Sequence, residues 1–302
     1  MLSKILRKLC FLPFNSDVCV FSNAQGVLLM FYVNDVVIVA TDIHMIQSVR
    51  NLLKAHFDLK ELGPVYQFLG FKVIRDRPSR YIYISQKQYT QAIIEKYGYR
   101  DLNSVATPWP SGFELPTTWQ QLSNTNYIKQ TGSLNYLSIN TRPDITYTTN
   151  RLSEANQGPS EQHLQLLKHL FRYLIGSADL SLRYGGKFPI QNLHLRAYGD
   201  ASFADRLDTR LSTGGHIIFL AGSPIIWKSK KQTLVTLSST EAEFINLTPT
   251  ASALLWINTI LNDAGYPQPK PLVMYTDSQN ARLITLNPLI LARTRYINIR
   301  YK

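Results

Sequence analysis

The chain has 302 residues, of which 45% are hydrophobic and 17% charged, a composition that excludes a disordered protein and suffices for two domains. Its formal net charge of +12 favours a polyanionic partner, either nucleic acid or a membrane surface. Because no apolar run is as long as we expect of a bilayer span, we expect nucleic acid and no membrane. Cys10 and Cys19 are too few for a disulfide framework, so we expect an intracellular setting.

The first structural signal is a pair of apolar, β-prone runs within residues 26–40, separated by Asn34 and Asp35. An Asn-Asp pair suits a tight turn, so the pattern predicts a β-hairpin with its turn at these two residues. Taken alone, the pattern indicates a buried hairpin with a structural role.

The next part of the chain alternates between the two periodicities. Helical spacing predicts a helix over residues 43–57, and alternating apolar positions predict paired strands over 68–76 and 81–86. A further helix is expected over 86–99. Three prolines within residues 106–118 then predict an extended connector, which is the first candidate domain boundary.

Three helical patterns follow, over residues 127–141, 143–156 and 160–176. On the last of these, Lys168 and Arg172 lie one helical turn apart beside aromatic residues. Two interpretations are open, an ordinary solvated face or a surface that follows a phosphate backbone.

A glycine-containing stretch at residues 185–191 is the second candidate boundary, and beyond it the order of elements is typical of an α/β domain. Residues 211–232 predict a hairpin of two apolar strands. Lys228, Lys230 and Lys231 cluster where this hairpin ends. Such a cluster serves either solubility or contact with nucleic acid.

A long helix is expected to begin after Ser238. Ser238 with Glu241, and Thr240 with Glu243, both have the spacing of a capping box. Pro249 is expected to kink or break the helix. Both acids could serve only the helix dipole and the free N–H groups of the first turn.

Two further acids change that interpretation. Asp200 lies at the end of one expected strand and Asp277 at the end of another. In α/β sheets the carboxyl ends of the strands face the ligand-binding crevice. Acids from two strand ends and one helix start could converge on Mg²⁺, which prefers oxygen ligands, and paired ions can hold both oxygens of a phosphodiester. The pattern therefore suggests a nuclease.

Several long segments of the chain resemble one family. The chain is similar to the carboxyl-terminal part of a Copia-type retrotransposon polyprotein, which comprises the end of the reverse transcriptase and the RNase H domain. The segments that carry the resemblance, in family order, are FYVNDVVIVATD, LKELGPVYQFLGFKV, LNYLSINTRPDI, YGDASFADRLDTRLSTGGHIIFL, WKSKKQTLVTLSSTEAEF, YTDSQNA and ARTRYINIRY.

The resemblance implies an α/β and α+β protein with three segments. Residues 1–115 are expected to be a truncated reverse transcriptase palm and thumb remnant, and 116–187 a helical connection region. Residues 188–302 are expected to be an RNase H-like mixed-sheet α/β domain that is clipped at its carboxyl end.

The hairpin also has a counterpart in the family, where it carries two adjacent aspartates that hold the catalytic metals. Here Asn34 stands at the first position and only Asp35 matches. An amide offers a cation an oxygen but no charge, and the family's upstream polymerase aspartate is expected to precede this chain. We therefore expect an inactive polymerase half.

For the RNase H domain the resemblance implies Asp200, Glu243 and Asp277 as catalytic, metal-binding residues, with Glu241 kept as the helix-start acid. Asn298 stands where the family has a fourth acid. The implied cofactors are two Mg²⁺ or Mn²⁺ ions, and the implied substrate is an RNA–DNA hybrid. The alternative is a catalytically dead transposon remnant that only binds nucleic acid.

Overall fold

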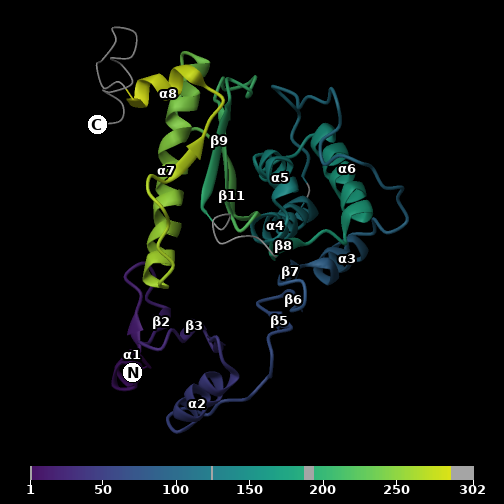
Figure 1. The fold of residues 1–302 in the computed structure, drawn as a ribbon. Coiled ribbons are helices and arrows are strands. Elements are labelled where there is room, and N and C mark those ends of the chain that lie inside the picture. Colours follow the sequence, from purple (N-terminus) through teal and green to yellow (C-terminus); the bar gives the residue numbers. More distant parts are fainter. Residues whose placement is uncertain (1, 124, 187–193, 287–302) are drawn as a thin grey trace. The chain divides into compact units, whose positions relative to one another are not determined.

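The computed structural model describes residues 2–123, 125–186 and 194–286, and it has a mixed α/β fold with several antiparallel sheets (Figure 1). The chain forms two compact units. Unit 1 comprises Met1–Tyr66 and Ser252–Leu272, and unit 2 comprises Gln67–Ala251 and Val273–Lys302. This division differs from the expected segments, so the three-segment organisation stays a prediction.

Unit 1 contains an antiparallel sheet with the strand order β1-β2-β3-β4 and helices that bury apolar side chains with it. Its elements before residue 66 are α1 (Leu2–Lys8), β1 (Leu12–Pro13), β2 (Val20–Ser22), β3 (Leu28–Tyr32), β4 (Asp35–Val39) and α2 (Ile43–Lys54). The expected hairpin and the helix after it are therefore confirmed.

The turn of that hairpin lies one residue earlier than expected. Tyr32 pairs with Asp35, so the turn residues are Val33 and Asn34, and Val33 has a positive φ of 53°. Leu29, which is buried, pairs with Ile38, which packs against the same core. A slip of one residue would move every side chain of β4 to the other face, so packing sets the register despite the unfavourable turn residue.

Unit 2 begins with a second antiparallel sheet and a group of helices around one core. These elements are β5 (Gln67–Phe68), β6 (Phe71–Asp76), β7 (Tyr81–Ser85), α3 (Lys87–Lys96), α4 (Thr125–Asn140), the 3-10 helix η1 (Pro143–Ile145), α5 (Thr146–Ser153), α6 (Glu161–Ser177) and β8 (Leu182–Gly185). The expected strands, helices and connector are confirmed. Strand β8 was not expected, and it pairs antiparallel with β7, Ile84 opposite Leu182.

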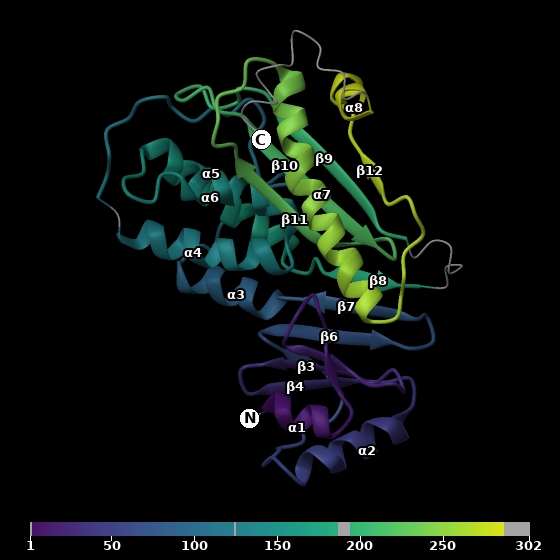
Figure 2. The ribbon, with the colours of Figure 1, turned by 90° about the vertical axis from the view of Figure 1, so that its left-hand side faces the viewer.

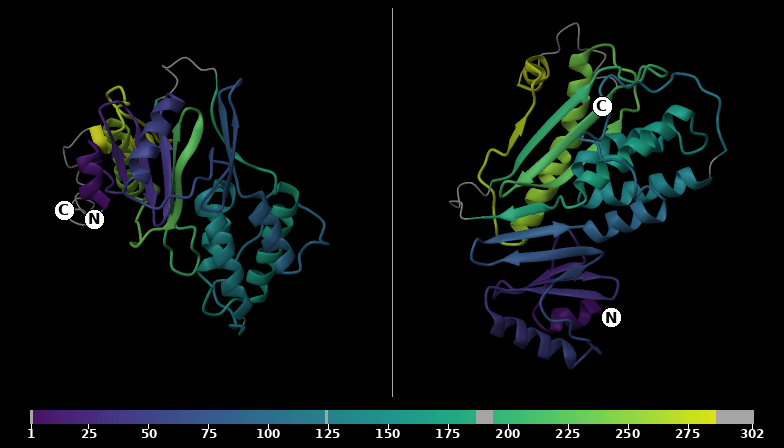
Figure 3. Two further views of the ribbon diagram at one scale, coloured as in Figure 1. Left: turned by 90° about the horizontal axis from the view of Figure 1, so that it is seen from below. Right: turned by 90° about the vertical axis from the view of Figure 1, so that its right-hand side faces the viewer.

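The third sheet carries the acids. Its strands and the helices that follow are β9 (Arg196–Ser202), β10 (Thr213–Leu220), β11 (Ser223–Lys231), α7 (Ser239–Asp263), β12 (Val273–Tyr275) and α8 (Gln279–Leu286). The order is β11-β10-β9-β12, in which only β12 pairs parallel to its neighbour, so the sheet is mixed. Within unit 2, the first half of α7 lies on one face of the sheet, and α4 and α5 lie on the other (Figures 1 and 3).

The first half of α7 approaches the sheet closely (Figure 2). The side-chain amide of Asn246 donates hydrogen bonds to the carbonyl oxygens of Asp200 (2.9 Å) and Gly215 (2.8 Å). A Cβ at Gly214 would collide with Oδ1 of Asn246, so glycine at this position leaves room for the Asn246 side chain as it is placed. The helix is thereby fixed to the backbone beside Asp200.

The expected break at Pro249 does not occur, because α7 continues through it. Leu247 and Thr250, on either side of the proline, are buried, and Asn246 is hydrogen-bonded to the sheet, so tertiary contacts hold the helix where a backbone donor is missing. As a result α7 is long and apolar enough, by length and composition alone, to cross a membrane. The expectation that no apolar run reaches that length was wrong.

Candidate metal centre

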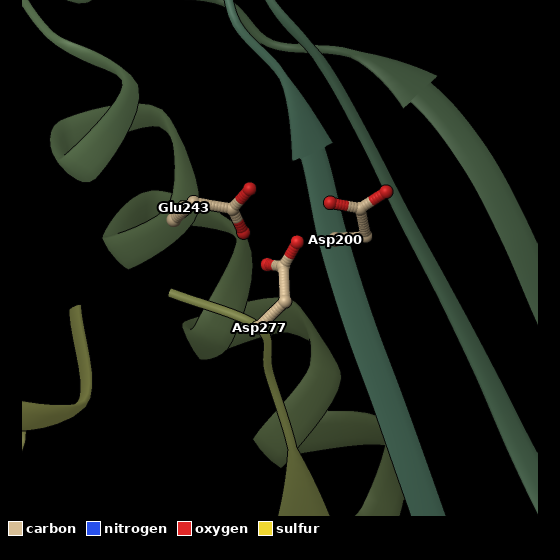
Figure 4. Close-up of side chains that lie close together, drawn as sticks. All are labelled: Asp200, Glu243 and Asp277. Carbon is tan, nitrogen blue, oxygen red and sulfur yellow. The ribbon is translucent and has the colours of Figure 1, made fainter. Parts of the chain in front are cut away.

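Three carboxylates meet at one end of the mixed sheet of unit 2 (Figure 4). Asp200 comes from β9, Glu243 from the start of α7, and Asp277 from the segment just after β12. One oxygen of each lies within 4.8 Å of the others. The structure thus brings together the three acids that the sequence singled out.

Strand lengths explain why the three can meet. Strand β12 pairs with Arg196–Tyr198 of β9 and then ends, so β9 extends beyond its neighbour. Beyond the end of β12, the N–H of Ala201 on β9 donates a hydrogen bond to Oε1 of Glu243 (3.0 Å). Tyr198 and Tyr275 are paired; Asp200 lies two residues further along β9, and Asp277 lies two residues further in the segment just after β12.

The two acids at the start of α7 have different roles in the structure. Oγ of Ser238 accepts a hydrogen bond from the N–H of Glu241 (3.1 Å), and Oε2 of Glu241 accepts one from the N–H of Leu237 (2.7 Å). Glu241 therefore caps the helix, much as the capping-box spacing predicts. Glu243, two residues later, is the acid that faces Asp200 and Asp277.

The electrostatics of the cluster are unfavourable without a cation. Burial raises the pKa of Glu243 to about 7, and the negative charges of Asp200 and Asp277 add to this effect, while the Ala201 hydrogen bond opposes it. Oε2 of Glu243 is buried and has no hydrogen-bond partner in the described part of the chain. Converging carboxylate oxygens of this kind fit a hard divalent cation such as Mg²⁺ or Mn²⁺.

A cleft of about 590 Å³ adjoins the cluster and lies entirely within unit 2. It is lined by β9, β10 and β11, by the residues around the end of β12, and by η1 with the start of α5. Asp200, Asp277 and Lys228 line it together with His216, whose pKa is lowered by burial and then by the charge of Lys228. A lysine and two of the three cluster acids thus line the same cleft.

Four aromatic residues that sequence reasoning missed also line this cleft: Tyr147, Tyr198, Tyr275 and Trp227. Tyr198 and Tyr275 had a visible signal, because each stands two residues before a cluster acid, in YGDAS and in YTDSQ. Tyr147 and Trp227 had none, since they reach the cleft through the packing of α4 and α5 against β11. Trp227 Nε1, for example, donates to the carbonyl oxygen of Ser138 (2.7 Å).

The predicted basic contacts are dispersed. Lys228 lines the cleft, Lys230 is exposed on the same strand, and Lys231 ends that strand. On α6, Lys168 is exposed, whereas Nε of Arg172 donates to the carbonyl oxygen of Asn103 (2.7 Å) and so has a structural contact.

The remaining predicted residues lie elsewhere. Asn34 and Asp35 lie in the hairpin of unit 1, and Asn298 lies outside the described residues. The second candidate boundary, residues 185–191, is described only up to residue 186.

Comparison with known proteins gives a consistent assignment. Residues 1–111 match the family model described as reverse transcriptase (RNA-dependent DNA polymerase). The chain is 35% identical to the retrovirus-related Pol polyprotein from transposon TNT 1-94 of Nicotiana tabacum, over 98% of this chain, and 33% identical to that from transposon RE2 of Arabidopsis thaliana, over 95%. It is 30% identical, over 76% of its length, to a predicted transposon Ty5-1 protein of Saccharomyces cerevisiae, of which it covers 74%.

The chain spans only about a fifth of the two Pol polyproteins, 23% of the first and 20% of the second. No solved structure matches the chain.

Proposed function

This chain belongs to the Copia-type family of retrotransposon Pol polyproteins, and from that premise we propose that its carboxyl-terminal part is a Mg²⁺-dependent endonuclease that cuts RNA in RNA–DNA hybrids. The observation that carries the proposal is the convergence of Asp200, Glu243 and Asp277 at one end of a mixed sheet. The strand order β11-β10-β9-β12, with the first half of α7 across one face, supports an RNase H-like domain.

The chain's own residues have separate roles in this reaction. Asp200 and Asp277, which are exposed, would hold the cations from the cleft side, and Glu243 would bind from the buried side as a carboxylate that has lost its proton to solvent. The Ala201 N–H keeps the Glu243 carboxylate oriented. A bound pair of ions supplies an activated water and stabilises the leaving 3′ oxygen.

Binding of the substrate follows from the charge of the chain. The net charge of +12 attracts a polyanion over distances of several ångströms, and Lys228 places a cation in the cleft beside the acids. The phosphate backbone of a hybrid is the ligand that satisfies both the basic surface and the proposed metal centre.

The reverse transcriptase part is proposed to lack polymerase activity. Asn34, beside Asp35 at the hairpin turn, offers oxygen but no charge where the family has an aspartate, so a metal next to a triphosphate would be bound weakly. Extension of a DNA primer on an RNA template, in Mg²⁺ or Mn²⁺, tests this directly. We expect no product, and detectable synthesis would refute it.

A second candidate function is supported by two amides that stand at family acid positions. Asn34 and Asn298 both stand where the family has metal-binding acids, which favours a decayed remnant that binds nucleic acid without cutting it. The two candidates differ only in catalysis, so cleavage of a labelled hybrid under titrated Mg²⁺ and Mn²⁺ decides between them.

The matched variants for that assay are Asp200→Asn and Asp208→Asn. Asp200 is in the cluster, whereas Asp208 is an exposed acid of the following loop, outside the cluster. We expect Asp200→Asn to abolish cleavage but keep hybrid binding, and Asp208→Asn to cleave as wild type. Asn298→Asp, which adds the family's fourth carboxylate, should lower the metal concentration required. If the folded wild type and Asn298→Asp both bind hybrid without cutting it at any metal concentration, the binding-only function holds.

A further inference from the structure

Three aromatic rings form a row across the mixed sheet next to the carboxylate cluster. The ring of Phe219 on β10 meets Tyr198 on β9 edge to face, with centroids 5.8 Å apart, and Tyr198 stacks on Tyr275 of β12 at 4.9 Å with an interplanar angle of 17°. Strand β12 is the outermost strand of this sheet in the described part of the chain. The row therefore ends at Tyr275, whose ring has one face occupied by Tyr198.

The two tyrosines remain open to solvent although their rings stack. Tyr198 is 42% exposed and Tyr275 46% exposed, so neither is a core residue. Each also lines the cleft that holds Asp200 and Asp277. A stacked pair of tyrosines that is half exposed inside a cleft presents a flat apolar surface to whatever enters it.

The spacing relates this surface to the metal centre. Tyr198 and Asp200 lie two residues apart on the exposed face of β9, a step of about 6.6 Å. Tyr275 pairs with Tyr198, and Asp277, in the segment just after β12, has a carboxylate oxygen within 4.8 Å of one of Asp200, so the aromatic pair lies one short step from the acid pair. A ligand that fits both pairs carries a phosphate and, one short step away, a flat ring. A nucleotide has this chemistry.

We propose that Tyr198 and Tyr275 form a stacking platform for an unpaired nucleobase of the strand whose phosphate lies at the metal centre. A base can stack on an aromatic side chain only if one of its faces is open. In a duplex, neighbouring bases cover both faces of each paired base. The site thus prefers a strand with an unpaired nucleotide beside the bound phosphate over a fully paired duplex. This inference rests on the proposed function for the position of the phosphate.

The test measures binding and stacking without cleavage. A short RNA containing 2-aminopurine is titrated with the full chain in Ca²⁺, both single-stranded and fully paired to DNA, and 2-aminopurine quenching and Kd are recorded. Tyr275→Phe keeps the ring and should stay within about twofold of wild type. Tyr275→Leu should lose the quenching and weaken single-strand binding by about 5- to 150-fold, the range for one base stack, while binding of the paired duplex changes little.

Tyr266→Leu is the control, because Tyr266 is an exposed tyrosine of unit 1 outside the cleft, and it should bind as wild type. The wild-type chain alone should quench 2-aminopurine fluorescence, and this measurement does not depend on whether any variant folds. If the wild type causes no quenching, the platform is overturned. Equal single-strand binding by Tyr275→Leu and wild type also overturns it. If such a result accompanies normal hybrid cleavage, the proposed nuclease stands without the platform. If quenching depends on the Tyr275 ring but no hybrid is cut, the platform stands and the nuclease fails.

Discussion

Substituting Glu243 by Gln should stabilise the metal-free protein, although it removes a proposed metal ligand. Glu243 is buried beside Asp200 and Asp277, and its pKa is raised to about 7 from an ordinary value of 4.5. Glutamine keeps an oxygen that can accept the hydrogen bond from the N–H of Ala201. The substitution therefore removes the charge repulsion and retains the local contact.

The pH dependence follows from the direction of this pKa change. Between pH 4.5 and about 7 the folded chain keeps a proton on Glu243 that the unfolded chain has lost. The wild-type free energy of unfolding therefore falls as pH rises through this window, and the full cost is present above it. At about 1.4 kcal/mol per pH unit, the cost is at most about 3 kcal/mol.

Urea denaturation in a metal chelator, at about pH 8.5 and about pH 4.5, measures this difference. The background variant Trp256→Phe removes the tryptophan of unit 1, so fluorescence reports unit 2 through Trp109, Trp119 and Trp227. In that background, Glu243→Gln should be more stable by up to about 3 kcal/mol at the higher pH and nearly neutral at the lower one.

Glu241→Gln is the matched control, since Glu241 lies two residues away and caps the helix through the N–H of Leu237. Removing that charge from the helix start should cost about 0.5–1 kcal/mol, the opposite sign. Added Mg²⁺ should stabilise the wild type and leave Glu243→Gln almost unchanged. A Glu243→Gln chain that is less stable than wild type at the higher pH without metal would show that charge repulsion at Glu243 does not destabilise the metal-free protein.

Three further predictions concern stability. Glu154→Gln removes the 2.7 Å ion pair with the guanidinium of Arg206, which is 1% exposed and keeps a longer ion pair with Asp205 at 3.9 Å. Because Glu154 is 29% exposed and Asp205 remains, we expect a loss of about 3 kcal/mol in urea denaturation, the low end for a buried pair. Burial lowers the pKa of His163 to about 4, and Nδ1 of His163 accepts a hydrogen bond from the N–H of Ser160. The free energy of unfolding should therefore fall by up to about 3 kcal/mol as the pH drops from 6.5 towards 4. A His163→Gln chain should lack this pH dependence. Val33→Asn should raise the free energy of unfolding by about 1 kcal/mol, because Val33 is 87% exposed and asparagine tolerates its φ of 53° better than valine does. Thermal denaturation measures this, and a lower Tm would contradict it.

Local structure was largely predictable from the sequence. Apolar, β-prone runs located the hairpins of β3 with β4 and β10 with β11, and the spacing of Ser238 and Glu241 located the start of α7. These patterns depend on residues a few positions apart, whose side chains interact wherever the segment lies. The choice of Asp200, Glu243 and Asp277 needed the family resemblance, since acids at strand ends and helix starts are common.

Other features were decided by contacts between distant segments. The pairing of β8 with β7 joins Leu182 to Ile84, and no local pattern marks a partner that far away. The continuation of α7 through Pro249 depends on Asn246 and Thr250 packing against the sheet, which offsets the missing backbone donor.

The chemistry of the site divides in the same way. The acids, the Tyr-x-Asp repeat and the positive charge that favours a polyanion can all be read from the residues in order. Three features depend on the folded chain: β12 ends short of Ala201, Glu243 accepts the hydrogen bond of Ala201 there and has a raised pKa, and Tyr198 stacks on Tyr275. Residue type and spacing act along the chain, whereas burial, desolvation and ring stacking depend on which distant segments exclude water from one another.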